Sequence, residues 1–317
     1  MVELGYALSS EEFAPDALID NARRAEEVGF SFALISDHYH PWVTKQGEAP
    51  FVWAVIGGIS RVTSQLQLGT GVTCPTVRIH PAIIAQAAAT SAAMMPGRFF
   101  LGVGTGENLN EHIVGKGWPP QQVRLDMLEE AVTVIRGLWE GKQFSHRGDH
   151  FIVENAQIYT LPDQLPPLMV AAAGDETGEV AGRIGDGLIS TSPNQKVVET
   201  FDENGGTGKP RYGQLTVCWA KDEQTAKKQA LEIWPNGGMT SGMHSQLPTP
   251  AFFDEAIRLV TEDMLAEQIP CGPDPERHKA AIQKFIDAGF DHVYIHQIGP
   301  DQDGFFDFYQ REIMPAF

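Results

Sequence analysis

The sequence predicts an α/β fold, a (β/α)8 TIM barrel with insertion segments at the carboxyl-terminal face. Three observations point to it. Short apolar runs alternate with amphipathic stretches along most of the chain, which is the order of a parallel sheet with crossover helices. There are eight such runs, and they are continuous, as expected for strands that are buried on both faces. A length of 317 residues fits one barrel-sized domain.

The expected strands follow one another along the chain. In order they are Leu4–Ala7, Phe32–Ser36, Leu66–Gly71, Phe99–Val103, Leu168–Ala172, Gly187–Ser190, Leu215–Ala220 and His292–Gln297. Amphipathic helices are expected between them, several of them opened or preceded by an Asp or Pro that suits a helix start. These helices are Asp16–Glu27, Ala82–Met94, Arg124–Glu140, Glu176–Ile184, Glu223–Ile233 and Glu276–Asp287.

Three segments exceed the simple repeat, at about residues 104–120, 143–160 and 234–273. The second has strand-like ends around a Gly-Asp turn, which predicts a hairpin after the long helix. The third mixes Asn-Gly-Gly, Gly-Met-His and Pro-Thr-Pro with helical stretches. Insertions of this length are usually functional. No composition shift marks a linker, so residues 1–317 are expected to form a single domain.

The charge balance argues against nucleic acid and membrane surfaces as partners. There are 41 acidic and 23 basic residues, a net charge of -18, so anionic surfaces would repel the chain. No stretch approaches the roughly 18 apolar residues of a membrane span. The sparse cysteines, Cys74, Cys218 and Cys271, lack C-x-x-C spacing, which argues against a disulfide framework. Without a leader-like start, we expect a cytoplasmic protein that acts on a small molecule.

Residues that directly follow barrel strands are candidates for chemistry, since barrel active sites form there. Asp37 and His38 follow the second expected strand, with Trp42 close behind. A hydrogen bond from a ring N–H of His38 to the Asp37 carboxylate could fix the tautomer of His38 and orient it as a general base.

A metal site is the alternative interpretation of this segment. His38 and His40 form an H-x-H pattern, which supplies two metal ligands in some hydrolase barrels. The fifth and sixth strands end in small residues without His, Cys or carboxylate, so only Asp175 and His296 could complete an irregular site. We therefore expect no metal.

The fourth strand runs into a glycine-rich turn that ends at Glu107. This carboxylate stands where the third glycine of G-x-G-x-x-G would be, so the spacing excludes a Rossmann motif. A tight, dry pocket around Glu107 would favour its neutral form, which can donate a proton. After the third strand, Gly71 and Val72 would let a flat ring approach the backbone closely.

Small residues also follow the fifth and sixth strands. Ala173 and Gly174 follow the fifth, and Thr191 follows the sixth. Backbone N–H groups and hydroxyls at these positions would suit a phosphate, which barrels bind in their later loops.

Two sequence strings are highly specific in combination, S-D-H-Y-H-P-W at Ser36–Trp42 and G-T-G-E-N-L-N-E at Gly104–Glu111. Further matching strings are H-P-A-I-I-A-Q-A at His80–Ala87 and A-G-R-I-G-D-G at Ala181–Gly187. On these strings the chain, over nearly its whole length, resembles the luciferase-like flavin and deazaflavin oxidoreductases. Within them it is similar to the coenzyme F420-dependent glucose-6-phosphate dehydrogenase group.

The resemblance implies an F420-dependent oxidoreductase, a homodimer, and a non-proline cis peptide at Gly71–Val72. It implies that His38 is the base taking the substrate's hydroxyl proton and that Glu107 is the acid, with Trp42 and Glu11 as stabilising neighbours. The cofactor contacts that it implies are Asp37, Gly71, Val72, Thr105, Gly106, Glu107, Asn110, Ala173, Gly174 and Thr191.

The chain departs from this group at the substrate phosphate. The sugar-phosphate dehydrogenases hold it with three basic residues, and the alignment places Asn194, Met243 and Glu267 there, beside His244. A phosphate without cations would be desolvated without compensation. We therefore expect an alcohol or carbonyl substrate that is not a sugar phosphate. Basic residues that could rebuild the clamp are Lys196, Lys209 and Arg211.

Two other functions remain open on the sequence. An FMN-dependent luciferase-like oxidoreductase or monooxygenase would keep the fold and change the cofactor. A catalytically silent relative would keep the fold and bind a flavin without catalysing a reaction. Against this alternative, the chain retains the candidate residues Asp37, His38, Trp42 and Glu107.

Overall fold

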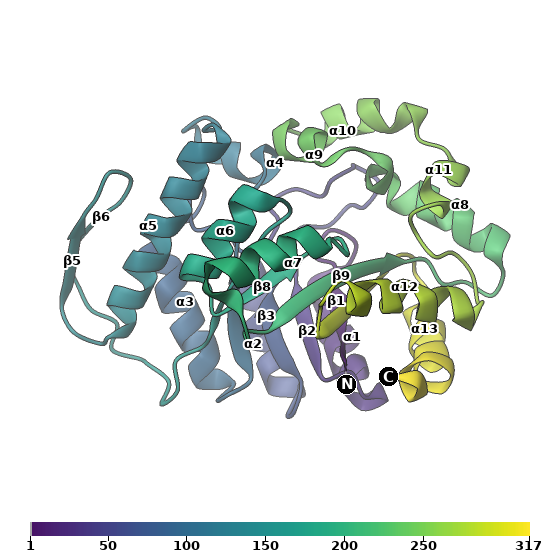
Figure 1. Cartoon of the computed structure of the whole chain (residues 1–317), viewed down its shortest axis with the longest axis horizontal. Helices are drawn as coiled ribbons and strands as arrows, with labels where there is room; N and C mark the ends of the chain where they lie inside the picture. The colour runs from purple at the N-terminus through teal and green to yellow at the C-terminus, as the bar shows by residue number, and fades with distance from the viewer. Residues whose placement is uncertain (1) are drawn as a thin grey trace.

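A closed barrel of eight parallel strands forms the centre of the computed structural model, which describes residues 2–317 (Figure 1). Around the barrel the strand order is β1-β10-β9-β8-β7-β4-β3-β2. This confirms the predicted (β/α)8 class. The barrel strands are β1 (Glu3–Leu8), β2 (Phe32–Ile35), β3 (Gln67–Thr70), β4 (Phe99–Val103), β7 (Leu168–Ala171), β8 (Gly187–Ser190), β9 (Arg211–Val217) and β10 (His292–Gln297).

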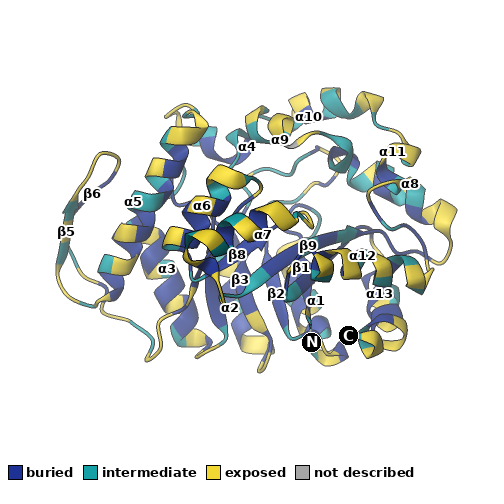
Figure 2. Cartoon of the chain, in the orientation of Figure 1, coloured by how far each residue is buried: buried dark blue, intermediate teal, exposed yellow. Residues whose placement is uncertain are grey.

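Helices surround the barrel and turn their buried faces toward it (Figure 2). Those between the strands are α1 (Pro15–Val28), α2 (Val52–Val62), α3 (Pro81–Met94), α4 (Asn108–Glu111), α5 (Gln121–Trp139), α6 (Asp175–Ile184), α7 (Gln195–Phe201), α8 (Glu223–Ile233) and α12 (Pro275–Asp287). Helix α13 (Gln302–Phe308) follows the last strand. Of these, α2, α4, α7 and α13 were not expected. Helix α2 is apolar nearly throughout and contains two glycines, α4 is four residues long, and α7 and α13 are only seven residues long.

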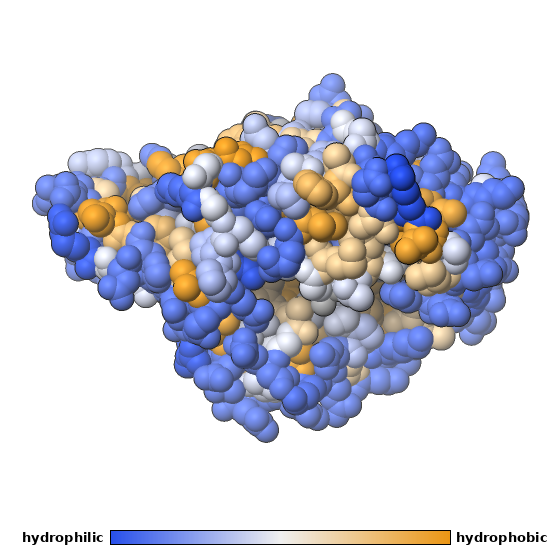
Figure 3. All heavy atoms as spheres, turned by 90° about the horizontal axis from the view of Figure 1, so that it is seen from above, coloured by the Kyte–Doolittle hydropathy of each residue, from blue (hydrophilic) through white to orange (hydrophobic). Residues whose placement is uncertain are grey.

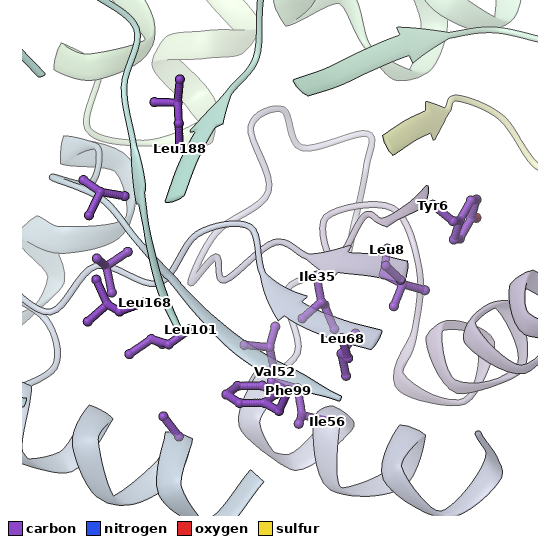
Figure 4. Close-up of a cluster of buried hydrophobic side chains, with 14 of the residues drawn as sticks. Tyr6, Leu8, Ile35, Val52, Ile56, Leu68, Phe99, Leu101, Leu168 and Leu188 are labelled. Atoms are coloured by element: carbon purple, nitrogen blue, oxygen red, sulfur yellow. The ribbon is translucent and has the colours of Figure 1, made fainter. Parts of the chain in front are cut away.

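The main core lies between the strands and the helices. Side chains on the outer face of the barrel, such as Leu8, Ile35 and Leu101, pack there against helical residues such as Val52 and Ile56 (Figure 4). A smaller cluster fills the interior of the barrel, because successive side chains on a strand point to opposite faces. Its members are Ala7, Phe32, Leu34, Phe100, Met169, Ile189, Tyr212 and Tyr294.

Strand β9 begins four residues before its expected start and ends three before its expected end. The expected strand, Leu215–Ala220, followed the apolar run, whereas Gln214 and Thr216 belong to the strand and are polar. Both line a cavity rather than the apolar core. A strand that opens onto a polar cavity on one face is therefore not continuously apolar.

The three insertions lie in different places. Segment 143–160 folds as a hairpin of β5 (Phe144–Arg147) and β6 (Ile152–Ala156), in a connection that leads to the amino end of β7 and thus away from the face where barrel sites form. Segment 104–120 holds α4 after β4. Segment 234–273 holds α9 (Ser241–Gln246), α10 (Pro250–Ala256) and α11 (Glu262–Ala266). In Figure 1 these last three helices lie along one edge of the molecule.

Within the described chain, the search for a helix long and apolar enough to cross a membrane found none.

Candidate active site

A cavity of about 1220 Å³ opens at the carboxyl ends of the barrel strands. Its walls combine residues that end the strands with residues of the 234–273 insertion, such as Trp234, Met239 and His244. Seen from above Figure 1, hydrophobic residues gather around a hollow near the middle of the surface (Figure 3). A site of this size and position is where barrel enzymes bind small molecules.

The imidazole of His38 faces this cavity between two acceptors. Its Nδ1 lies 3.1 Å from the carbonyl oxygen of His40, and its Nε2 lies 3.3 Å from Oε1 of Glu11. Nδ1 can only donate to the carbonyl, so Nε2 is the atom that exchanges a proton with its surroundings. The His38 and Glu11 side chains are 10% and 3% exposed.

Glu11 remains ionised next to His38. Burial by itself would raise the pKa of Glu11, but the charge of His38 and a hydrogen bond from Ser36 Oγ, at 2.6 Å, bring that pKa below its usual value. Ser9 Oγ donates a second hydrogen bond at 3.1 Å to the same oxygen. Glu11 thus offers one oxygen to His38 and is fixed through the other.

Asp37 does not orient His38, so the predicted Asp–His pair is wrong. Its carboxylate accepts hydrogen bonds from Arg78 Nη2 at 2.8 Å and from Thr73 Oγ1 at 2.7 Å. Arg78 also pairs with Glu111. Adjacent residues in an extended segment point in opposite directions, which directs Asp37 into the protein when His38 faces the cavity.

Two aromatic rings of the cavity wall lie beside His38. The ring of Trp42 packs edge-on against it, with centroids 4.8 Å apart, and His244 packs against the other side of Trp42 at 5.0 Å. Burial lowers the pKa of His244, although its hydrogen bond to the carbonyl oxygen of Asn236 opposes the shift. His244 is therefore a neutral imidazole near pH 7, and Trp42 is held between two imidazoles.

Glu107 lines the cavity at the end of β4, as Thr105 and Gly106 do. Gly106 has φ +74°, and a Cβ there would lie 2.6 Å from Cys74 Sγ, so glycine is required at this turn. Arg124 donates to the carbonyl oxygen of Gly106 at 3.3 Å. This contact holds the turn that carries Glu107.

Asn110 braces the loop of His38 and is absent from the cavity wall formed by the described residues. Its Oδ1 accepts hydrogen bonds from the N–H groups of Tyr39 and His40, at 2.9 and 3.2 Å. Its role in the structure is to join the ends of β2 and β4.

The floor of the cavity is built from small residues. The Gly71–Val72 peptide is cis, as the resemblance implies. A Cβ on Gly104 would lie 2.7 Å from Val72 Cγ2, and one on Gly71 would lie 2.9 Å from Leu34 Cβ. Glycine is therefore required at both positions, because the backbone there packs directly against Leu34 and Val72.

The later strand ends also line the cavity, through Ala173, Thr177 and Thr191. The N–H groups of Ala173 and Gly174 both donate to Thr177 Oγ1 at 3.1 Å. These two donors, expected to be available for a phosphate, are thus used to cap the start of α6.

Asn194 and Met243 are not part of the cavity wall formed by the described residues, which corrects the predicted substrate pocket. Asn194 caps α7 by accepting from Lys196 N–H, and Met243 is 41% exposed on α9. Glu267 and His244 do line the cavity. Met243 lies in the 234–273 insertion, where alignment fixes register poorly because loops tolerate changes in length. Asn194 lies outside that insertion, and its side chain is used to cap α7.

The three basic residues considered as a replacement clamp are engaged elsewhere. Lys196 pairs with Asp175, and Lys209 donates to two backbone carbonyls. Arg211 pairs with Asp202 and Asp291.

Several cavity residues were missed by the sequence analysis, among them Arg277 and Lys284 on α12. Both belong to a helix whose amphipathic pattern indicates an exposed polar face, so no sequence signal distinguishes them from solvated residues. His296 also lines the cavity. The sequence analysis considered His296 only as a ligand of an irregular metal site, although its place near the carboxyl end of the last strand marks it as a candidate active-site residue.

No group of three or more His, Cys, Asp and Glu side chains within residues 2–317 is arranged to hold a metal ion. His40, the second member of the H-x-H pattern, directs Nδ1 to the carbonyl oxygen of Leu109 at 2.9 Å.

Comparisons with known proteins agree with this geometry. A family model described as luciferase-like monooxygenase matches residues 1–292. An F420-dependent glucose-6-phosphate dehydrogenase of Kineococcus radiotolerans is 36% identical, over 99% of this chain and 96% of that protein. One of Microbacterium testaceum is 34% identical, over 99% and 97%.

Solved structures extend the comparison. An F420-dependent secondary alcohol dehydrogenase in complex with an F420–acetone adduct has a TM-score of 0.91 at 31% identity, covering 99% of this chain and 98% of that one. The F420-dependent tetrahydromethanopterin reductase from Methanopyrus kandleri, at 23% identity and a TM-score of 0.80, shares the fold. With a family match over most of its length and relatives above 30% identity over nearly all of it, the chain belongs to the luciferase-like monooxygenase family.

Proposed function

We propose that this protein is a coenzyme F420-dependent oxidoreductase that interconverts an alcohol and the corresponding carbonyl compound. The observation that carries the proposal is the Glu11–His38 pair, which faces the same cavity as Glu107 above a floor of small residues. The F420-dependent relatives and the F420-dependent secondary alcohol dehydrogenase of the same fold support the choice of cofactor.

The cavity suits a deazaflavin. Gly71 and Gly104 line it without side chains, so that the wall there is backbone, on which a flat ring could lie. Thr105, Gly106, Ala173 and Thr191 also line it and would hold the cofactor. When bound, coenzyme F420 supplies a two-electron acceptor that takes a hydride from the carbinol carbon.

His38 is the general base in this proposal. Its Nε2 takes the hydroxyl proton as the C–H and O–H bonds of the alcohol break and the C=O bond forms. Glu11 stabilises the imidazolium that results, because the carboxylate is ionised and 3.3 Å away. Trp42 excludes water from one side of the imidazole, and Glu107 is the proton donor for the cofactor ring.

We propose further that the substrate is uncharged. Glu11 and Glu267 line the cavity, and of the cations that line it, Arg124 and Arg277 are engaged with the carbonyl oxygen of Gly106 and with Glu223, which leaves Lys284 on α12. A substrate dianion placed among these carboxylates would be repelled, whereas a neutral alcohol would be accepted against Trp42 and Met239.

Binding of the two candidate cofactors tests the proposal. Because Trp42 and Trp234 line the cavity, tryptophan fluorescence should respond to a ligand there. Titration with oxidised F420 should give a lower Kd than titration with FMN, and the loaded protein should reduce F420 in the presence of a secondary alcohol. Tighter binding of FMN, or oxygen consumption with reduced FMN, would contradict it.

A further inference from the structure

A second carboxylate–imidazole pair lies beside the first. Glu12 Oε2 is 2.7 Å from Nε2 of His296, and the two side chains are 4% and 2% exposed. The consecutive residues Glu11 and Glu12 follow β1, which pairs with β2 on one side and β10 on the other. Glu11 thus pairs with the histidine that follows β2, and Glu12 with a histidine on β10.

The imidazole of His296 faces the cavity with one nitrogen available. Its Nε2 is engaged with Glu12, while its Nδ1 has a long contact of 3.4 Å to Thr216 Oγ1. The edge of the Trp234 ring system packs against it, with centroids 4.3 Å apart. Because Thr216 and Trp234 also line the cavity, Nδ1 and the Thr216 hydroxyl form a small polar site against an aromatic wall.

Stability of the fold does not account for this pair. Among the described residues, Glu12 Oε1 is buried and no protein group hydrogen-bonds to it. A buried acceptor in that state destabilises the fold, and buried polar groups of native proteins are almost always satisfied. A carboxylate retained at such a cost is typical of a site that binds or positions a ligand.

The charges around His296 favour a neutral ligand over an anion. Glu11 and Glu12 both lie close to it, so an anion at Nδ1 would meet two carboxylates, and Tyr6 and Gln302 behind the pair are neutral. A hydroxyl group carries no charge and can both donate and accept, which matches an imidazole nitrogen beside a threonine hydroxyl.

We propose that His296, positioned by Glu12, binds together with Thr216 a second, non-reacting hydroxyl group of the substrate. The substrate class is then a diol or hydroxyketone rather than an alcohol with a single oxygen. The inference rests on the proposed function for the reacting hydroxyl at His38. Adjacent strands lie about 4.8 Å apart, so β2 and β10, with β1 between them, are about 10 Å apart. Imidazoles from these two strands that face the same cavity can therefore contact one small molecule.

Matched alcohols with one and two hydroxyl groups test the proposal. With F420-loaded protein, kcat/KM for 2,3-butanediol or 2,5-hexanediol should exceed that for 2-butanol or 2-hexanol at least tenfold. In Glu12→Gln/His296→Phe, which removes the carboxylate and the imidazole together, this preference should disappear through a higher KM for the diol. The values for the mono-alcohols should stay within about threefold. An equal preference in the variant, or an equal loss of kcat on all four alcohols, would overturn the proposal.

Thr216→Val supplies a variant that keeps the buried pair intact. It removes one hydroxyl at nearly constant volume and should lower the preference for the diol in the same direction, by about three- to tenfold. If the preference for the diol is unchanged both in Thr216→Val and in Glu12→Gln/His296→Phe, this site does not contact the substrate.

Binding without turnover separates this inference from the proposed function. Saturation-transfer NMR with 2,5-hexanediol and 2-hexanol should show stronger transfer to the diol. This difference should be lost in Glu12→Gln/His296→Phe. If this difference is seen while no alcohol is oxidised with F420, the proposed function fails and the diol site stands. If alcohols are oxidised but the diol gains nothing from His296, the diol site fails and the proposed function stands.

Discussion

Glu11 Oε1 and His38 Nε2 lie 3.3 Å apart at the edge of the cavity, joined from two adjacent strands of the barrel. The other ring nitrogen, Nδ1, is fixed by a backbone carbonyl. This arrangement leaves one mobile proton, at Nε2, and places a negative charge beside it, which is how a histidine is prepared to act as a base.

His38→Ala should abolish alcohol oxidation while leaving the affinity for F420 within a few-fold. The imidazole accepts a proton and does not form the floor on which the ring would lie, and loss of a general base lowers rates on the order of 10²- to 10⁴-fold. Steady-state kinetics and fluorescence titration of the same preparations would measure both. Equal turnover in the variant would assign the proton to another group.

Glu11→Gln should lower kcat and change the response of stability to pH. The pKa of Glu11 in the folded protein is below its usual value of 4.5, so ionised Glu11 contributes stability above about pH 4.5, and this is lost as the pH falls through the folded pKa. The difference in unfolding free energy between wild type and variant should therefore be largest near pH 7 and shrink below pH 4.5. A difference that grows on acidification would contradict this assignment. Urea denaturation at both pH values is the measurement.

Arg78→Ala should destabilise the protein by about 3–5 kcal/mol, the usual result of removing one partner from a buried ion pair. It leaves Asp37 and Glu111, each 1% exposed in its side chain, without their cation. Burial already raises the pKa of Glu111, and Arg78 counteracts that shift. The loss of unfolding free energy in Arg78→Ala should therefore be larger at pH 7.5 than at pH 5.5, where protonation of Glu111 removes its unpaired charge.

Arg147→Ala is the matched control for Arg78→Ala. Its ion pair with Glu154 is more than two-thirds exposed on both sides, so its removal should change the unfolding free energy by less than about 1 kcal/mol. Urea denaturation would compare the two variants. An equal loss of unfolding free energy in both would mean that burial of the Arg78 ion pairs does not increase their contribution to stability.

Gly104→Ala should weaken F420 binding at least tenfold and destabilise the fold by about 1–3 kcal/mol. The added Cβ would lie 2.7 Å from Val72 Cγ2, in the floor of the cavity. Gly57→Ala on α2 is the control, because a Cβ there meets nothing within 4 Å and alanine favours a helix. Fluorescence titration with F420 would compare the two, and unchanged affinity in Gly104→Ala would show that the ring does not lie on this floor.

The sequence predicted the barrel because regularly packed strands and helices impose a regular spacing of apolar residues on the chain. Seven of the eight expected strands overlap the observed ones closely, and β9 shifted because Gln214 and Thr216 face the cavity and interrupt its apolar pattern. The same rule identified the residues that follow the strands, His38 and Glu107 among them, as candidates for chemistry, and both line the cavity.

Side-chain partners were harder to predict than positions. Asp37 is adjacent to His38 in the chain yet binds Arg78, whereas Glu11, from another strand, supplies the carboxylate. Asn194 and Met243 were placed by alignment through segments whose register no periodic pattern fixes, and neither is part of the described cavity wall. Arg277 and Lys284 reach the cavity from a helix, for which a strand-end rule gives no signal.

Glucose 6-phosphate should be a poor substrate, and its response to salt should distinguish a local from a global cause. The net charge of -18 repels a dianion over long range, and salt screens this over about 8–10 Å. Repulsion by Glu11 and Glu267 inside the cavity is screened much less. With the same cofactor, kcat/KM for glucose 6-phosphate should stay roughly 100-fold below that for a neutral secondary alcohol, a gap of about 2.8 kcal/mol. Raising the salt from 20 to 500 mM should narrow that gap only in part.

The cations of the cavity provide the means of checking this expectation. Arg277, whose Nη1 pairs with Glu223 at 3.0 Å, and Lys284 both line the cavity from α12. If glucose 6-phosphate is oxidised as efficiently as a neutral alcohol, these two residues are the ones that hold its phosphate. Lys284→Ala would then raise the KM for the sugar phosphate and leave the KM for the alcohol unchanged. If the sugar phosphate remains poor at both salt concentrations, Lys284→Ala should affect neither substrate, because the carboxylates and not the cations decide what the cavity accepts.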